Sequence, residues 1–190
     1  QNVNVGVAIT AGKLGIGFTD TNIKIGSTAL DSLTTGGNNV AVGNAALTAN
    51  TGGSQNTAVG GEALDANTTG NYNTAVGRNA LGQSTTASSN TAVGQYALES
   101  NVTGDENTAV GTSALDANLA SDNTAVGMRA LYANTTGTAN TGIGKQALDA
   151  NTTASNNTAV GYRSLLLNTT GTQNTAVGAL ALDANTTASY

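Results

Sequence analysis

The sequence contains no cysteine, histidine, proline or tryptophan, and these absences exclude several kinds of chemistry. Without histidine or cysteine, the chain lacks the commonest general base, the thiol nucleophile and the usual ligands of transition metals. The fold must also be stable without disulfides. One pair of adjacent acids occurs, Asp105-Glu106, which we interpret as part of a solvated turn. We therefore expect no enzymatic activity, no catalytic residue, no cofactor and no metal ligand.

Charged residues are also scarce, at 9% of the chain, with 11 acidic and 6 basic side chains and a net charge of −5. The basic residues are scattered, whereas nucleic acids and anionic membranes are bound through clustered lysine and arginine. No apolar run approaches the ~18 residues of a membrane span. We expect neither nucleic-acid binding nor membrane insertion. Because the sequence begins at Gln1, we expect it to be part of a longer protein.

Most of the sequence is one short motif, Asn-Thr-Ala-Val-Gly-x-x-Ala-Leu-x-x-Asn, repeated ten times with small variations. Eight of the nine steps between motif glycines are 17 residues long and one is 16. A fixed short period indicates that each unit stacks on its neighbours. The motif glycines are Gly26, Gly43, Gly60, Gly77, Gly94, Gly111, Gly127, Gly144, Gly161 and Gly178.

The Asn-Thr-Ala-Val half of each unit predicts a short parallel strand, because threonine and valine favour extended structure. We therefore predict an all-β fold, a parallel β-solenoid of about ten 17-residue coils that forms a shaft over residues 22–190. Residues 1–21 differ from the motif and are predicted to be an N-terminal β cap or the end of an upstream domain. The Ala-Leu half has no β-branched residue, so we predict that this second limb is either a short strand or a helical turn.

Two apolar columns recur in all ten units, one just before the motif glycine and one four residues after it. We predict that both point inward, so that the core contains Val59, Leu64, Val76, Leu81, Val93, Leu98, Val110, Leu115, Val126 and Leu131. Because side chains alternate across a strand, the threonine shares the inward face of the valine and the alanine between them points outward. We predict that these alanines form an inter-chain interface, made of Ala58, Ala75, Ala92, Ala109, Ala125, Ala159 and Ala176.

Asparagine recurs at two further positions, four residues before and seven residues after the motif glycine. Asparagine suits turns, and its side-chain amide can form a ladder with the asparagine of the next coil. The second column creates Asn-x-Thr sequons, which we interpret as turn chemistry rather than glycan sites. These sequons begin at Asn67, Asn101, Asn134, Asn151, Asn168 and Asn185.

A single coil of this composition buries little apolar surface, so we expect a partner surface, and three copies around an axis form a closed arrangement. The motif, written out at Asn56-Thr57-Ala58-Val59-Gly60-x-x-Ala63-Leu64, resembles the head repeats of trimeric autotransporter adhesins and the shaft repeats of phage tail fibres. This resemblance implies left-handed parallel β-rolls, a homotrimer, and a place outside the cell, on a cell surface or on a virion. It also implies a role in adhesion or host attachment.

The repeated positions all have a packing or turn explanation, which favours a structural protein. We predict a spacer shaft of a trimeric fibre, with any receptor bound through domains outside these residues. Two alternatives remain, a self-assembling surface filament and an ice-binding solenoid, because regular threonine columns can match a flat lattice. The predicted inward direction of the strand threonines argues against ice binding.

Overall fold

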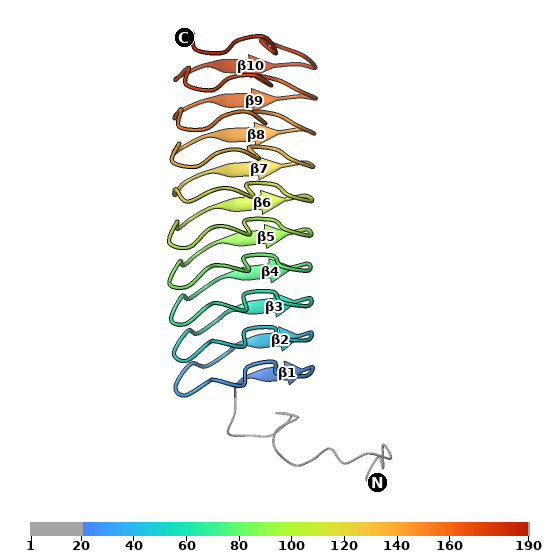
Figure 1. Ribbon diagram of the computed structural model, residues 1–190, viewed down its shortest axis with the longest axis vertical. Helices are drawn as coiled ribbons and strands as arrows, with labels where there is room; N and C mark the ends of the chain where they lie inside the picture. The colour runs from blue at the N-terminus through green and yellow to red at the C-terminus, as the bar shows by residue number, and fades with distance from the viewer. Residues whose placement is uncertain (1–20, 190) are drawn as a thin grey trace.

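The computed structural model describes residues 21–189, so the predicted N-terminal cap lies outside the described residues except at its last position. Ten parallel strands follow one another along the stack and no helix occurs within residues 21–189 (Figure 1). Each strand has three residues: β1 Ile23–Ile25, β2 Val40–Val42, β3 Thr57–Val59, β4 Thr74–Val76, β5 Thr91–Val93, β6 Thr108–Val110, β7 Thr124–Val126, β8 Thr141–Ile143, β9 Thr158–Val160 and β10 Thr175–Val177. The predicted all-β parallel solenoid with a 17-residue spacing is confirmed.

The strands pair in strict register, so that each motif position lies directly over the same position of the next coil. In β3 and β4, for example, Ala58 pairs with Ala75. Register also holds across the one shortened repeat, where Thr108 of β6 pairs with Thr124 of β7. The missing residue falls in the corner after Asn118. The side-chain amide of Asn118 donates to the carbonyl of Ala120, two residues later, whereas that of the equivalent Asn101 donates to the carbonyl of Gly104, three residues later. The sheet is therefore continuous through the irregular coil.

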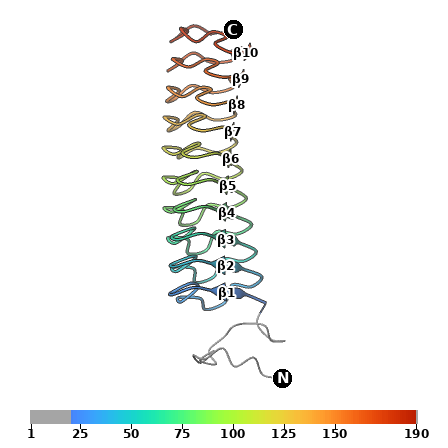
Figure 2. The same ribbon diagram turned by 90° about the vertical axis from the view of Figure 1, so that its right-hand side faces the viewer.

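The core consists of leucine and alanine. The predicted leucines are confirmed as core residues, because Leu64, Leu81, Leu98, Leu115 and Leu131 are fully buried. The alanine that follows each motif glycine by three residues is also buried in most coils, as at Ala63 and Ala80. In Figure 2 the strands lie along one side of the stack, and the second limb runs along the other. The interior between these two walls holds one leucine and two alanines per typical coil.

The predicted orientation of the strands is wrong. The alanines at the middle of the strands, Ala58, Ala75, Ala92, Ala109, Ala125, Ala159 and Ala176, are buried inside their own chain, so they cannot form the predicted inter-chain interface. The valines next to them point outward: Val59 and Val93 are half-buried, while Val76, Val110 and Val126 are each 36% exposed. The predicted valine half of the core is therefore wrong.

The width of the coil explains this reversal. Gly142 occupies the alanine position in β8, and a methyl group added there would lie 3.3 Å from Cγ of Leu131. The inward-facing strand position is thus in van der Waals contact with the leucines of the opposite limb, which leaves room for a methyl group. A valine at this position would overpack the interior, and overpacking costs about 1–3 kcal/mol per site.

The second limb is neither a strand nor a helical turn. Its backbone repeatedly enters the left-handed region, at Gly60 with φ 142°, Glu62 with φ 59° and Leu64 with φ 51°. The amide of Glu62 donates to the carbonyl of Asn44 in the preceding coil, and the amide of Leu64 donates to the carbonyl of Ala80 in the next coil. A left-handed non-glycine residue costs on the order of 1–3 kcal/mol, and hydrogen bonds to both neighbouring coils offset that cost.

Candidate functional surfaces

The outer face of the sheet carries two regular columns, which we call the sheet face. One column contains the first strand residue, which is threonine in eight successive coils: Thr57, Thr74, Thr91, Thr108, Thr124, Thr141, Thr158 and Thr175. The other contains the third strand residue, which is valine or isoleucine: Val42, Val59, Val76, Val93, Val110, Val126, Ile143, Val160 and Val177. Most of these side chains are half-buried, and no charged residue occurs in either column.

Within the described stack, the hydroxyls of the eight sheet-face threonines form no hydrogen bond with the protein. The threonines of the corner behave differently. Thr68 donates its hydroxyl to the carbonyl of Thr85 at 3.0 Å, and Thr152 donates to the carbonyl of Thr169 at 3.2 Å. Corner hydroxyls therefore help to hold adjacent coils together, whereas sheet-face hydroxyls are free to bond with solvent.

The asparagine that precedes each strand forms an internal ladder along the whole stack. Nine rungs join these residues, each from a backbone amide to the side-chain carbonyl of the asparagine below, at 2.8–3.0 Å. Each side-chain amide also donates to a corner carbonyl later in the same coil, as Asn56 does to Gly70 at 2.8 Å. The ladder thus ties every strand to the strand before it and to the corner after it.

The second asparagine column lies in the corner and is buried. Asn151 is typical: its amide donates to the side-chain carbonyl of Asn134 at 2.9 Å and to the backbone carbonyl of Ala154 at 3.0 Å. Five of the six sequon asparagines are fully buried, namely Asn67, Asn101, Asn134, Asn151 and Asn168. For these five, the burial and hydrogen bonding of the amide support the interpretation as turn chemistry. The sixth, Asn185, is half-buried and makes the same two bonds, to the side-chain carbonyl of Asn168 and to the backbone carbonyl of Ala188.

This corner ladder has a break at Ser84, which replaces asparagine in the coil that contains β4. Ser84 is fully buried and its hydroxyl has no hydrogen-bond partner in the described structure. The side-chain carbonyl of Asn67 is also unpaired, because the amide that would reach it from the next coil is missing. Buried polar atoms without a partner cost about 1–3 kcal/mol each, so Ser84 is a weak point of the shaft.

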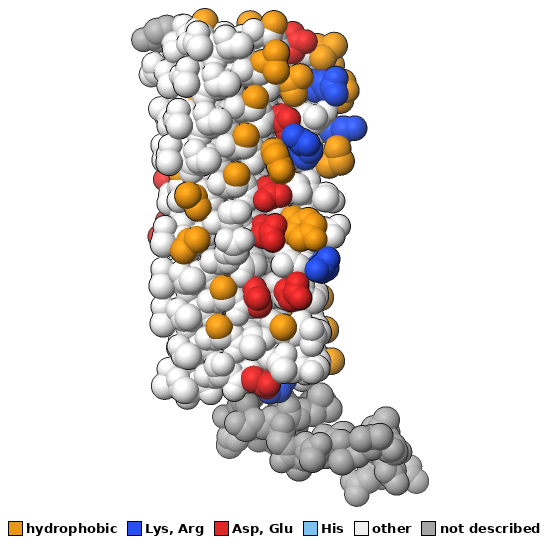
Figure 3. Space-filling model, viewed as in Figure 1, with side chains coloured by type: hydrophobic (Ala, Val, Ile, Leu, Met, Phe, Trp, Pro, Cys, Tyr) orange, Lys and Arg blue, Asp and Glu red, His pale blue; other side chains and the backbone are white. Residues whose placement is uncertain are grey.

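Acidic side chains gather on the face opposite the sheet, shown in red in Figure 3. We call the acids that stand five residues after the motif glycine the acid column: Asp31, Asp65, Glu99, Asp116, Asp149 and Asp183. Burial raises the pKa of Asp65, Glu99 and Asp116 above their ordinary values, and the negative charge of Asp116 adds to the shift of Glu99. Further along, Arg129 forms two hydrogen bonds to Asp149, at 3.0 and 3.1 Å, and its guanidinium lies 4.2 Å from the ring centre of Tyr132. The hydrogen bond to Asp149 raises the pKa of Arg129 further.

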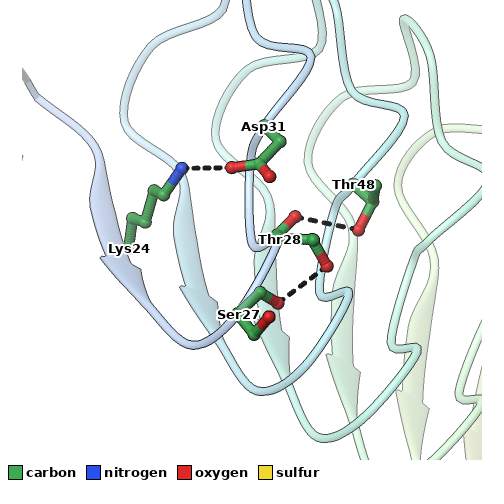
Figure 4. Close-up of polar contacts among 5 residues, drawn as sticks. All are labelled: Lys24, Ser27, Thr28, Asp31 and Thr48. Carbon is green, nitrogen blue, oxygen red and sulfur yellow. Dashed lines mark hydrogen bonds and ion pairs between the residues drawn. The ribbon is translucent and has the colours of Figure 1, made fainter. Parts of the chain in front are cut away.

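The first described coil departs from the motif, because Lys24 occupies the inward strand position. Its ammonium group forms an ion pair with Asp31, which is the first residue of the acid column (Figure 4). Beside this pair, Thr48 donates its hydroxyl to the carbonyl of Thr28 at 3.0 Å, and Thr28 donates to the carbonyl of Ser27 at 2.7 Å. The bond from Thr48 to Thr28 links the second limbs of the first two coils, whereas the other two contacts lie within the first coil.

Within residues 21–189, no group of three or more acidic side chains is arranged to hold a metal ion, and no helix is long and apolar enough to cross a membrane. Among the acids of this face, Asp116 is hydrogen-bonded by the side chain of Ser113, which partly offsets the effect of burial on its pKa. Comparison with models of protein families, with curated proteins and with solved structures finds no match to this chain.

Proposed function

We propose that this chain is a structural shaft, a spacer segment of an extracellular or virion fibre such as a tail fibre or an adhesin. The observation that carries the proposal is the unbroken ladder of asparagine side chains from Asn22 to Asn174. The recurring asparagines, leucine and glycine of the motif are used inside the stack, by the ladders, the core and the second limb, whereas the recurring valine lies on the sheet face. Among the positions that vary between coils, the one five residues after the motif glycine is acidic in six of the ten units.

The shaft would set distance rather than bind. Nine steps separate β1 from β10, and at about 4.8 Å per step the strands span roughly 43 Å. The proposal does not depend on a homotrimer, because each chain closes its own core and buries the alanines that were predicted to join three chains. Attachment to a receptor would belong to domains outside these residues, as the resemblance to fibre shafts suggests.

The experiment is to change the length of the shaft by whole coils. Deletion of residues 74–107 removes two 17-residue coils and joins Asn73 to Thr108, which preserves the motif. The rod measured by small-angle X-ray scattering should shorten by about 10 Å and remain folded. Deletion of residues 74–98 is the control: it ends out of phase with the motif and should disrupt the stack.

Two results would contradict the shaft. One is an in-phase deletion that unfolds the protein, because a shaft of equivalent coils tolerates the loss of two. The other is competition by this isolated chain with the intact fibre for its target at comparable concentrations. That result would move the binding site onto the coils.

A further inference from the structure

The sheet face is a regular two-dimensional array. Along the stack its side chains repeat once per coil, at about 4.8 Å, and across the strand the threonine and valine columns lie about 6.6 Å apart. An ordered layer of water bound to this face would repeat with these two spacings. The array remains in register through the shortened repeat, because that residue is lost from the corner and not from the strand. Eight threonines in succession therefore present the same geometry to solvent.

The chemistry of the array also suits ordered water. The hydroxyls of the sheet-face threonines are unpaired with protein, so each can bond to a water molecule. The methyl groups of threonine and valine lie between them and restrict the orientation of the first layer of water. Charged groups hold water in their own orientation, and neither column contains one. The acid column lies on the opposite face of the stack (Figure 3).

The face is also held rigid. Sheets of many strands normally twist, and those that stay flat are stabilised by stacking or by specific side-chain ladders. In Figure 1 all ten strands point the same way from the bottom of the stack to the top. The asparagine ladder directly precedes each threonine, as Asn90 precedes Thr91, and fixes that end of every strand. The sheet face therefore keeps its spacing over the full height of the stack.

We propose that the sheet face binds ice, through an ordered layer of water on its threonine hydroxyls and valine methyl groups. The strand direction found in the structure reverses the sequence argument against this activity, because the threonines point outward. A second copy of the chain is the competing occupant. The sheet face is three residues wide and nine coil steps tall, which gives an area of roughly 430 Å². This area is about half the ~800 Å² that each partner buries in a standard protein interface. Neither column offers an aromatic anchor.

The test measures thermal hysteresis, the gap between melting and freezing points that an ice-bound protein creates, together with inhibition of ice recrystallisation. The whole chain should show both activities. The double variant Thr91→Lys/Thr108→Lys places two long charged side chains at the centre of the sheet face and should lose most of the hysteresis at the same protein concentration. The matched control is Thr86→Lys/Thr103→Lys, which changes two exposed corner threonines of the same coils and should keep the hysteresis.

Circular dichroism of both double variants should show an unchanged fold, because all four positions face solvent. The proposal fails if the parent chain has neither activity, or if the corner variant loses as much hysteresis as the sheet-face variant. Sedimentation supplies a third readout. An oligomer of the parent chain that the sheet-face variant dissociates would show that a second copy covers this face, and would overturn ice binding. None of these results changes the length of the rod, so the spacer function is tested separately.

Discussion

The break in the corner ladder at Ser84 predicts that one substitution will stabilise the protein. Ser84→Asn supplies the side-chain amide that the coil of β4 lacks. The required geometry already exists elsewhere in the chain. Asn151 occupies the equivalent position and is followed three residues later by Ala154, just as Ser84 is followed by Ala87. The corner alanine therefore does not prevent the asparagine from fitting.

The magnitude follows from the bonds that are gained. The new amide would donate to the side-chain carbonyl of Asn67, which is now unpaired, and to the backbone carbonyl of Ala87. The unpaired hydroxyl of Ser84 would be removed at the same time. At about 0.5–1.5 kcal/mol per hydrogen bond, with relief of the two unpaired atoms, the free energy of unfolding should rise by about 1–3 kcal/mol. A change of 1 kcal/mol shifts the unfolding temperature of a chain this long by roughly 2–4 °C.

Urea unfolding followed by circular dichroism measures this gain, and two variants serve as controls. Ser84→Ala removes the unpaired hydroxyl without completing the ladder, so it should stabilise less than Ser84→Asn. Asn151→Ser introduces the same break into an intact part of the ladder and should destabilise by a similar amount. The reasoning is refuted if Ser84→Asn is no more stable than Ser84→Ala, because the ladder would then contribute nothing at this coil.

Two further predictions test the turn geometry and the acid column. Gly60→Ala should destabilise the protein strongly, because φ is 142° there and the added methyl group would lie 2.5 Å from the carbonyl oxygen of Gly77. The control is Gly61→Ala, where the added methyl group meets no atom closer than 4.0 Å. This control should be neutral or slightly stabilising in the same unfolding assay. Burial raises the pKa of Asp65, Glu99 and Asp116, so the folded state binds protons more readily than the unfolded state. The free energy of unfolding should therefore increase as the pH falls from neutral towards the ordinary carboxyl range. Asp65→Asn/Asp116→Asn should flatten this dependence, and an unchanged pH profile in that variant would contradict the assignment.

The sequence alone determined the architecture. A 17-residue period with a glycine, a leucine and two asparagines at fixed positions requires coils that stack in register, because only stacking makes each position equivalent to the next. The sequence also predicts that the leucine column lies in the core, because leucine is the largest apolar side chain that recurs in every coil, and the structure confirms it. The asparagine columns are predicted to form turns and ladders for an equally local reason, the hydrogen-bonding capacity of the side-chain amide.

The direction in which the strands face depends on tertiary contacts. A strand of three residues alternates in either phase, so Thr57-Ala58-Val59 can bury its middle residue or its two outer ones. The choice depends on the distance to the opposite limb, where leucines such as Leu131 leave space for a methyl group and no more. The second limb is decided in the same way. Local propensity disfavours the left-handed backbone at Leu64, and the bond from its amide to Ala80 in the next coil reverses that preference. Both outcomes depend on contacts between residues of different coils or limbs, which local sequence patterns do not encode.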